Sequence, residues 1–432
     1  MSKILTRRQF LRNTSLLAAS AVCVPAFCQD TAPSNKLNVV VIGPCNRGAA
    51  NLSGVINENV IAICDVNSQY LDQAGKRVPN AKHYADFRKM LEELDREIDA
   101  VVVSTPDHTH AVCAAMAMKM GKHCYCEKPL AHDVFETRRL QEIAAEKKVV
   151  TQMGTQIHAG DNYRRVVELI QSGAIGKVAE VHTWLNYSRP IKVGRPTDTP
   201  PVPEYLNWDL WLGPVAERPY SPAYVPGEWR RYWAFGNGLL GDFGCHYMDL
   251  PFWALGLQDC LTAESFGGNR DPEGVVGDVK VEYTFPARGD LPPVKLTWYT
   301  GMKPSILEEK GITDAPETGN LFVGTDGLLL ANYGMHKLYP EEKFADFKRP
   351  DPWIPTSIGH HEEWIQACKN NQPEATTCRF SYSGRLTETV LLGLVAFKAE
   401  SKIEWDPVAA KVTNCEKAND FLYTPYREGW TL

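Results

Sequence analysis

Residues 36–56 read KLNVVVIGPCNRGAANLSGVI, and this one stretch joins three structural signals. The run from Lys36 to Ile42 is apolar and rich in β-branched residues, which is typical of a strand buried on both faces. It opens directly into the glycine-containing turn Gly43–Gly48 (GPCNRG), and residues 49–56 are expected to form a short helix. A strand, a tight turn and a helix in this order predict the first unit of an open α/β sheet.

The turn has the spacing of a dinucleotide fingerprint, G-x-G-x-x-G, with Cys45 in place of the middle glycine. Gly43 is expected to make the tight turn, and Gly48 to let the helix pack against the strand. The middle glycine of the motif lets the backbone approach a pyrophosphate at the helix N-terminus, so the Cys45 side chain is expected to affect nucleotide affinity or pose. An ordinary glycine-rich turn is the alternative. The cofactor-binding residues predicted here are Gly43, Cys45, Asn46, Arg47 and Gly48.

A second apolar strand, Val60–Cys64, ends in Asp65, twenty-two positions beyond Gly43. An acid at that distance is placed to accept hydrogen bonds from both hydroxyls of an adenosine ribose. Its charge would also repel a 2′-phosphate. The sequence therefore predicts NAD as the cofactor in preference to NADP.

A third strand, residues 99–104, leads into the loop TPDHTH at positions 105–110 and then into a helix. The two histidines of this loop are candidate metal ligands, but two histidines with no carboxylate or thiol at ligand spacing make a poor metal site. We therefore predict no metal, and place the loop near a nicotinamide ring. The loop residues predicted to bind the cofactor are Thr105, Pro106, His108 and His110.

Residues 124–130 read CYCEKPL and place Lys128 just past the end of another probable strand, where an open α/β sheet presents its ligand site. A lysine there can donate to a substrate hydroxyl, or to the oxygen that becomes a carbonyl, while a neighbouring base takes the proton. Taken alone, the Glu-Lys-Pro tripeptide is equally compatible with an ordinary surface loop. In this context Lys128 is predicted to contact both cofactor and substrate, and Glu127 the cofactor.

With these elements assembled, the chain resembles the glucose-fructose oxidoreductase, inositol dehydrogenase and MocA family of NAD(P)-dependent enzymes. The matching segments are GPCNRG with Asp65, STPDHTHA, CEKPLA and GDFGCHYMD at residues 241–249. The resemblance implies that Lys128 contacts the substrate and that an Asp-x-x-x-His pair, here Asp242 and His246, supplies acid/base chemistry. It also implies an exposed sheet face and a homo-oligomer, either a dimer or a tetramer.

The pair is also reasonable on physical grounds. Residues 242–255 can form a helix that places Asp242 and His246 on one face, a turn apart. Histidine titrates near neutrality and suits the role of base for an alcohol proton, and a nearby carboxylate can fix its tautomer or share the substrate hydroxyl. The alternative is that Asp242 caps the helix and His246 belongs to the core. Asp249, one turn further on, is expected to be structural.

The N-terminus carries a twin-arginine motif, TRRQFLR at residues 6–12, followed by an apolar stretch too short to span a membrane. We predict a signal peptide over residues 1–28 and export to the periplasm. Export by this route carries folded proteins, so the twelve cysteines, which include no C-x-x-C pair, are expected to be mostly free thiols. The net charge of −6 argues against nucleic acid or an anionic membrane as a partner.

The fold predicted is a Rossmann dinucleotide-binding domain over residues 36–150, followed by an α+β domain over residues 151–432 with a large, open, mostly antiparallel sheet. Residues 197–233 are dense in proline and aromatic residues. This stretch is either an ordered surface arm or a wall on which tryptophans stack on a sugar while Arg230 and Arg231 bind its hydroxyls.

Two classes of function follow. The first is an NAD-dependent oxidoreductase acting on a small carbohydrate, glycoside or cyclitol, with a cofactor held tightly because the cell envelope offers no free NAD. This class includes a redox-neutral variant in which transient oxidation of a ring hydroxyl acidifies the adjacent carbon, so that a glycosidic group is eliminated. The second class is an NAD-containing protein that binds or senses a sugar without turnover.

Overall fold

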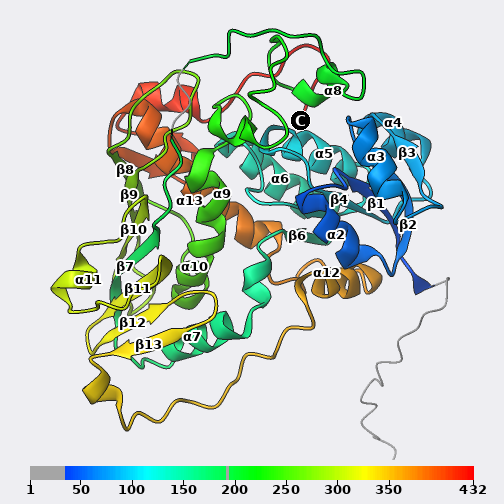
Figure 1. Ribbon diagram of the computed structural model, residues 1–432. Coiled ribbons are helices and arrows are strands. Elements are labelled where there is room, and N and C mark those ends of the chain that lie inside the picture. The colour runs from blue at the N-terminus through cyan, green and yellow to red at the C-terminus, as the bar shows by residue number, and fades with distance from the viewer. Residues whose placement is uncertain (1–34, 191–193) are drawn as a thin grey trace, which may run out of the picture. The chain divides into compact units, whose positions relative to one another are not determined.

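The first sheet of the computed structural model, which describes residues 35–190 and 194–432, has six strands that all run parallel (Figure 1). Across the sheet they are β3 (Lys82–Tyr84), β2 (Asn59–Cys64), β1 (Asn38–Ile42), β4 (Ala100–Val103), β5 (His123–Cys126) and β6 (Thr151–Met153). The strand order reverses at β1, and in such sheets the ligand crevice opens beyond the carboxyl ends of the strands on either side of that point. The predicted Rossmann domain is confirmed.

Five helices connect these strands, and the glycine-rich turn enters the first of them as predicted. They are α2 (Arg47–Val55), α3 (Ser68–Gly75), α4 (Phe87–Glu93), α5 (Asp107–Lys119) and α6 (Val134–Lys147). Strand β6 pairs in parallel with β5, Cys124 facing Thr151, so the first sheet continues past the predicted boundary at residue 150.

The second sheet has nine strands and is antiparallel except for the β7–β10 pair, in agreement with the predicted α+β domain. In spatial order the strands are β13 (His336–Tyr339), β12 (Leu328–Ala331), β11 (Thr318–Gly324), β7 (Val178–Leu185), β10 (Val294–Thr300), β9 (Lys280–Phe285), β8 (Thr262–Phe266), β14 (Ile403–Asp406) and β15 (Lys411–Val412).

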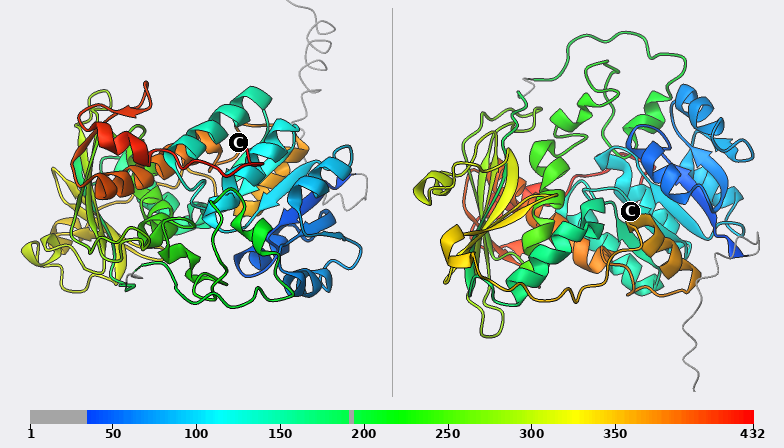
Figure 2. Two further views of the ribbon diagram at one scale, coloured as in Figure 1. Left: turned by 90° about the horizontal axis from the view of Figure 1, so that it is seen from above. Right: turned by 60° about the horizontal axis from the view of Figure 1, so that its bottom comes forward.

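Helices α7, α9, α10 and α13 lie between the two sheets (Figure 2), and α13 packs against α6 of the first domain and α9 of the second. The helical elements of this half are η2 (Gln156–Ala159), α7 (Asp161–Gln171), α8 (Trp208–Leu212), η3 (Glu228–Arg231), α9 (Gly238–Tyr247), α10 (Asp249–Leu255), α11 (Ile306–Glu309), η4 (Glu341–Phe344), α12 (His360–Lys369), α13 (Phe380–Ala399) and η5 (Glu416–Phe421). Within the described ranges, no helix combines the length and apolar character needed to cross a membrane. The predicted signal peptide, residues 1–28, lies outside those ranges.

The single helix expected over residues 242–255 is instead two helices that break at Met248, and the first begins four residues earlier, at Gly238. Pro251 has no N–H to donate to the carbonyl of Tyr247, which favours the break at this point. Asp242 and His246 remain on one helix, α9, one turn apart.

Helix α12 comes late in the chain but completes the first domain. Its Trp364 is buried in one cluster with Val39 and Val41 of β1, and the Nε2 atom of His361 lies 3.0 Å from Oδ1 of Asn51 on α2. The second half of the chain therefore covers the helix that follows the nucleotide-binding turn.

A methyl group at Gly48 tests how closely the turn and helix α2 must pack. A Cβ atom there would lie 1.7 Å from the carbonyl oxygen of Gly43, whereas a Cβ at Gly334 would meet no atom within 4 Å. We expect Gly48→Ala to lower the free energy of unfolding by about 1–3 kcal/mol, the range for overpacking, and Gly334→Ala to change it by less than about 0.5 kcal/mol. Urea denaturation measures both, and equal stability of the two variants would contradict this packing.

Candidate active site

A cavity of about 710 Å³ lies beyond the carboxyl ends of β1, β2, β4 and β5. Its floor includes the residue that follows each of those strands, Gly43, Asp65, Ser104 and Glu127. Side chains of the second domain, among them Arg230 and His246, complete its walls. This volume lies in the usual range of small-molecule and cofactor sites, about 300–1,000 Å³.

The nucleotide-binding turn shows how a cysteine fits the fingerprint. Gly43 has a φ of +75° and lies so close to β4 that a Cβ atom would sit 2.7 Å from the Ser104 carbonyl oxygen. The Cys45 thiol is turned toward α3, where it donates to the Tyr70 carbonyl at 3.3 Å. Cys45 and Gly43 both line the cavity, while Gly48 lies beneath the turn and serves its packing. The substitution therefore removes a glycine while leaving the sulfur with a partner in the protein.

Arg47, Asn46 and Glu127 also line the cavity, and an ion pair joins two of them. The Arg47 Nε atom lies 3.0 Å from a Glu127 oxygen, which also accepts from Asn51 at 3.0 Å and Gln156 at 2.8 Å. Burial would raise the pKa of Glu127, but the charges of Arg47 and Lys128 outweigh it and hold this pKa below its ordinary value. Glu127 is therefore an ionised carboxylate whose acceptors are already engaged, and it positions Arg47.

Asp65 has its carboxylate at the end of β2, facing the cavity. One of its oxygens accepts from the Asn67 N–H at 2.9 Å. Asp65 is partly exposed and lines the cavity. Burial among protein atoms raises the pKa of its carboxyl to about 7. A carboxylate in this position gains from any hydroxyl donors that enter the cavity.

The loop expected over residues 105–110 is shorter than predicted, because α5 already begins at Asp107 and includes both histidines. Its first turns place His108 and His110 in different surroundings. His110 lines the cavity together with Thr105 and Pro106, and its ring nitrogens lie 2.7 and 2.8 Å from the carbonyl oxygens of Thr105 and Pro129. His108 is outside the cavity lining: its Nε2 atom lies 2.9 Å from the Trp211 carbonyl oxygen, and burial lowers its pKa to about 4. His108 therefore anchors residues 197–233, the aromatic arm, to the first domain.

Lys128 reaches from the first domain to α9 of the second. Its Nζ atom donates to the Asp242 carbonyl at 2.7 Å and forms an ion pair with the Asp242 carboxylate, whose other oxygen lies 3.3 Å from Nε of Arg230. Burial alone would raise the pKa of Asp242, but the two cations lower it to about 2. Lys128 and Arg230 line the cavity, and Asp242 lies directly behind them.

His246 lies one turn beyond Asp242 and lines the cavity. Burial and the charge of Lys128 lower its pKa to about 3, so the imidazole is neutral at physiological pH. Its buried Nδ1 atom has no hydrogen-bond partner among the described residues. The neutral imidazole has a ring nitrogen free of a proton, and the burial and Lys128 charge that keep it neutral also oppose its protonation.

Arg231, predicted to bind substrate beside Arg230, is not in the cavity wall. It pairs with Glu228 at 2.7 Å and donates to the Pro190 carbonyl. The two arginines end the 3₁₀ helix η3, in which neighbouring side chains point in different directions. Only Arg230 turns toward Asp242.

Asp107 is a cavity residue that the sequence analysis did not single out. It is 4% exposed, begins α5, and accepts a hydrogen bond from the Asn237 N–H at the start of α9. Burial raises its pKa to about 7, although the charges of Arg230 and Lys128 act in the opposite direction. The signal was present in the sequence, since Asp107 immediately precedes His108, the first of the two histidines that were considered.

The aromatic arm is an ordered element with its own buried cluster. Trp208 stacks on Trp211 with ring centroids 4.7 Å apart, and Trp229 and Tyr232 are buried in the same cluster. The arm also lines the cavity through Tyr205, Leu206, Leu210, Trp211, Tyr220 and Trp229. It therefore packs as a surface arm and forms a wall of the cavity.

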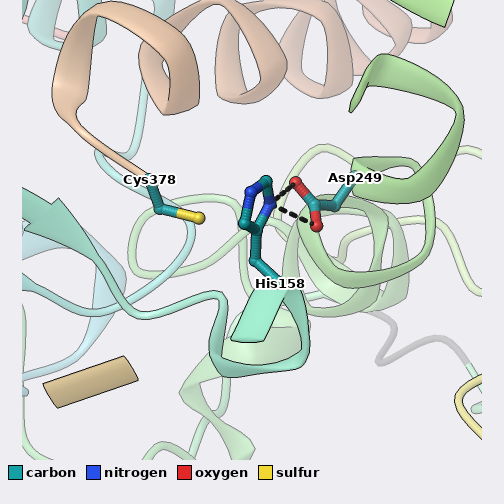
Figure 3. A group of neighbouring side chains, drawn as sticks. All are labelled: His158, Asp249 and Cys378. Carbon is teal, nitrogen blue, oxygen red and sulfur yellow. Dashed lines mark hydrogen bonds and ion pairs between the residues drawn. The ribbon is translucent and has the colours of Figure 1, made fainter. Parts of the chain in front are cut away.

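A second polar group, outside this cavity lining, consists of His158, Asp249 and Cys378 (Figure 3). Their candidate ligand atoms lie within 4.8 Å of one another, and the Cys378 sulfur points toward the His158 ring. His158 Nδ1 lies 2.9 and 3.0 Å from the two Asp249 oxygens, and the Tyr382 hydroxyl donates to Asp249 at 2.7 Å. These mutual bonds satisfy the buried carboxylate and imidazole and tie the start of α10 to its neighbours.

The cysteines of the described segments, ten in number, are all free thiols, as predicted. Nine of them are buried, including Cys64, Cys113 and Cys126 within the first domain. They act there as small apolar side chains.

Two family models match the chain: "Oxidoreductase family, NAD-binding Rossmann fold" over residues 37–155 and "Oxidoreductase family, C-terminal alpha/beta domain" over residues 160–285. Together they cover more than half of the chain. It belongs to the Gfo/Idh/MocA oxidoreductase family. Its N-terminal domain is accordingly an NAD-binding domain.

Two curated relatives match part of the chain. Levoglucosan dehydrogenase of Pseudarthrobacter phenanthrenivorans is 26% identical over 46% of this chain and 44% of its own length. Inositol 2-dehydrogenase of Salmonella paratyphi B is 29% identical over 37% of this chain and 43% of its own length. The chain thus spans less than half the length of either relative.

Solved structures of the same fold cover more of the chain. The WlbA dehydrogenase of Bordetella pertussis, in complex with NADH and UDP-GlcNAcA, superposes with a TM-score of 0.63 at 15% identity, covering 86% of this chain and 99% of its own. Levoglucosan dehydrogenase in complex with NADH and L-sorbose gives 0.57 at 18% identity, covering 85% and 98%. At these identities the likeness establishes the fold alone.

The raised pKa values of Asp65 and Asp107 predict a pH-dependent stability. Both lie near 7, above the ordinary unfolded value of about 3.9, so between these pH values the folded protein binds more protons than the unfolded chain. These two carboxyl groups should therefore lower the free energy of unfolding of the nucleotide-free protein as pH rises from about 4 to about 7. Asp65→Asn removes one such contribution, so we expect it to be more stable than the wild type at pH 8 and equally stable at pH 4.

Urea unfolding of nucleotide-free protein at the two pH values measures this difference. A variant that is less stable than the wild type at pH 8 would show that the Asp65 carboxylate stabilises the empty cavity.

Proposed function

We propose that this protein is an NAD-dependent oxidoreductase that oxidises a hydroxyl of a sugar, glycoside or cyclitol and retains its cofactor between turnovers. The observation that carries the proposal is the position of Lys128, Asp242 and His246. These three proton-handling groups meet at the edge of a cavity that begins at a dinucleotide-binding turn.

The residues present fit a dinucleotide. Gly43 permits close approach at the N-terminus of α2, and Asp65 is placed for a ribose. The buried Thr105 hydroxyl oxygen, at the end of β4, lacks a hydrogen-bond partner within the described ranges and is available to a ligand. The carboxylate of Asp65 would repel a 2′-phosphate, which supports NAD over NADP.

Bound NAD supplies the hydride acceptor for the carbinol carbon. The Lys128 ammonium, one of whose acceptors is the Asp242 carboxylate, can donate to the reacting oxygen and stabilise the charge that develops there. His246 is neutral and takes the hydroxyl proton as the carbonyl forms. Asp242 stays ionised and holds Lys128 in position, and Arg230 completes its charge balance.

The substrate class is supported by the relatives and by the aromatic arm. The curated relatives are named for levoglucosan and inositol, an anhydrosugar and a cyclitol. Aromatic side chains such as Trp229 and Tyr220 line the cavity, and aromatic rings pack well against the apolar faces of sugars. A retained cofactor is also what an exported enzyme requires, and the twin-arginine motif supports export to the periplasm.

A redox-neutral glycoside-cleaving activity is a second candidate, and Asp107 favours it. Such a reaction needs a further acid–base group, which takes the proton from the carbon next to the transient ketone and gives a proton to the departing glycosidic oxygen. Water then adds to the resulting double bond, and the hydride returns to the ketone, so no net oxidation remains. Asp107 faces the same cavity, and its pKa near 7 lets it act in both directions.

A sugar-binding protein without turnover is the remaining alternative. It would have no need of a neutral histidine beside a buried lysine–carboxylate pair, and these groups are all in place.

Substitution of the proton-handling residues separates these roles. Protein as purified and denatured in acid should release NAD or NADH. Lys128→Met and His246→Ala should keep that nucleotide but lower turnover by about 10²-fold or more, the usual effect of losing a positioned proton-transfer group. Arg231→Ala is the matched control, because Arg231 lies outside the cavity lining, and it should turn over normally. A wild-type protein that releases no nucleotide and binds none in titration would refute the proposed function.

The redox balance distinguishes the two reactions. A sugar added to nucleotide-loaded protein should give either a lasting NADH signal, cleared by a second carbonyl compound, or product without net NADH. In the redox-neutral case, solvent deuterium should enter the product next to the transiently oxidised carbon. Asp107→Asn should abolish that incorporation while the hydride transfer persists. Steady turnover that scales with added free NAD and releases stoichiometric NADH would contradict a retained cofactor.

A further inference from the structure

The part of the cavity wall nearest β2 and β3 is built by two segments that do not belong to the first domain. One is residues 205–211 of the aromatic arm, and the other is residues 427–430 near the C-terminus. We refer to these two segments together as the cofactor roof. Both contribute residues to the cavity lining, the arm through Tyr205, Leu206, Leu210 and Trp211 and the C-terminal segment through Trp430.

The arm is fixed immediately beside Asp65. The Ser68 N–H donates to the Tyr205 carbonyl at 2.8 Å, and the Asn207 N–H donates to the Val66 carbonyl at 2.9 Å. These bonds form an isolated antiparallel bridge between the arm and the residues that follow β2. The arm therefore crosses directly above the position that the proposed function assigns to the adenosine ribose.

The C-terminal segment is in turn fastened to the arm by Arg427. Its guanidinium donates to the Gly213 carbonyl at 2.6 Å and the Asp209 carbonyl at 2.7 Å, and pairs with the Asp209 carboxylate at 2.6 Å. The Arg427 N–H also donates to the Pro214 carbonyl at 2.9 Å. The Arg427 side chain is only 14% exposed, and its bond to Gly213 is partly buried, whereas the bonds to Asp209, whose side chain is 71% exposed, lie at the surface. One residue thus makes four bonds to the arm.

Trp430 closes the far side of the roof. Its ring lies 4.4 Å from the guanidinium carbon of Arg88 and 6.1 Å from the ring of Phe87, at the start of α4. Phe87, Trp430 and Thr109 all line the cavity. The roof thus spans from the residues after β2 to the helix after β3, with attachments to the first domain at both ends.

This placement identifies the half of the nucleotide that lies beneath the roof. In a Rossmann domain the acid at the end of β2 binds the adenosine ribose, so the adenine lies on the β2 and β3 side. We infer that the cofactor roof covers the adenosine half of NAD and that the bound nucleotide leaves only when the roof opens. The inference rests on the proposed function and names the residues that would make the cofactor a retained one.

The roof is separate from the proton-handling groups. No described contact of Arg427 or Trp430 joins either residue to Lys128, Asp242 or His246. Substitutions in the C-terminal segment therefore alter retention of the nucleotide without altering the residues assigned to chemistry. Such changes act mainly on the dissociation rate, as is usual for variants of one binding site.

The test is the rate at which bound NADH leaves the full-length protein. Trp430→Ala and Arg427→Ala should each release NADH roughly tenfold faster than the wild type when it is displaced by excess NAD in a stopped-flow experiment. Both should also bind ADP-ribose more weakly. The matched controls are Trp353→Ala, which removes a tryptophan that is 49% exposed, and Arg385→Ala, which removes an exposed arginine paired with Asp259. Both controls should release NADH at the wild-type rate.

The outcomes separate this inference from the proposed function. If the wild type binds no NAD or NADH, the proposed function fails and the roof has no cofactor to hold. If the wild type binds NADH but the roof variants release it no faster than the controls do, the inference is overturned and the proposed function stands. Hydrogen–deuterium exchange of the wild type gives a second measurement that needs no variant: NADH should slow exchange in residues 205–211 and 427–430 together. Unchanged exchange in both segments would also overturn the inference.

Discussion

The ion pair between Lys128 and Asp242 is the contact on which the site depends, because it joins a strand end of one domain to a helix of the other. Both side chains are largely buried, with 12% and 16% exposed. Removing Asp242 would leave the Lys128 charge without its carboxylate at the domain junction, at a cost of about 3–5 kcal/mol, whereas removing Lys128 leaves Asp242 paired with Arg230. The pair therefore fixes the position of α9, and with it His246, relative to the nucleotide-binding sheet.

Burial gives the ionisable groups of the cavity different protonation states at the same pH. Asp242 is ionised because two cations outweigh its desolvation, and His246 is neutral because it has lost water and faces Lys128. Asp107 lies in the same charge cluster yet has a pKa near 7, since its desolvation exceeds the help it receives from Arg230. An ionised carboxylate, a neutral imidazole and a carboxylic acid that titrates near neutrality thus lie at one cavity.

The cavity is assembled from segments that are distant in the chain. Helix α12 packs behind the nucleotide-binding turn, the aromatic arm forms one wall, and residues 427–430 close another. The arm supports itself through a buried aromatic cluster, and His108 joins it to the first domain. Helix α12 and Trp430 pack against the first domain, and residues 427–430 are also fastened to the arm, so the enclosed cavity requires several segments of the second half of the chain.

The sequence by itself determined the Rossmann domain and the preference for NAD. It also determined the positions of Lys128 and Asp65, because each of these residues follows a strand closely and the strand ends share one edge of a parallel sheet. It could not show that Asp107 faces the cavity while His108 is buried in the arm, or that Arg230 pairs with Asp242 while Arg231 turns away. Arg230 and Arg231 have the same chemical character, and Asp107 and His108 are neighbours in the first turn of α5. Which of them faces the site depends on the rotation and packing of short helical turns, and that is decided only by contacts between segments far apart in the chain.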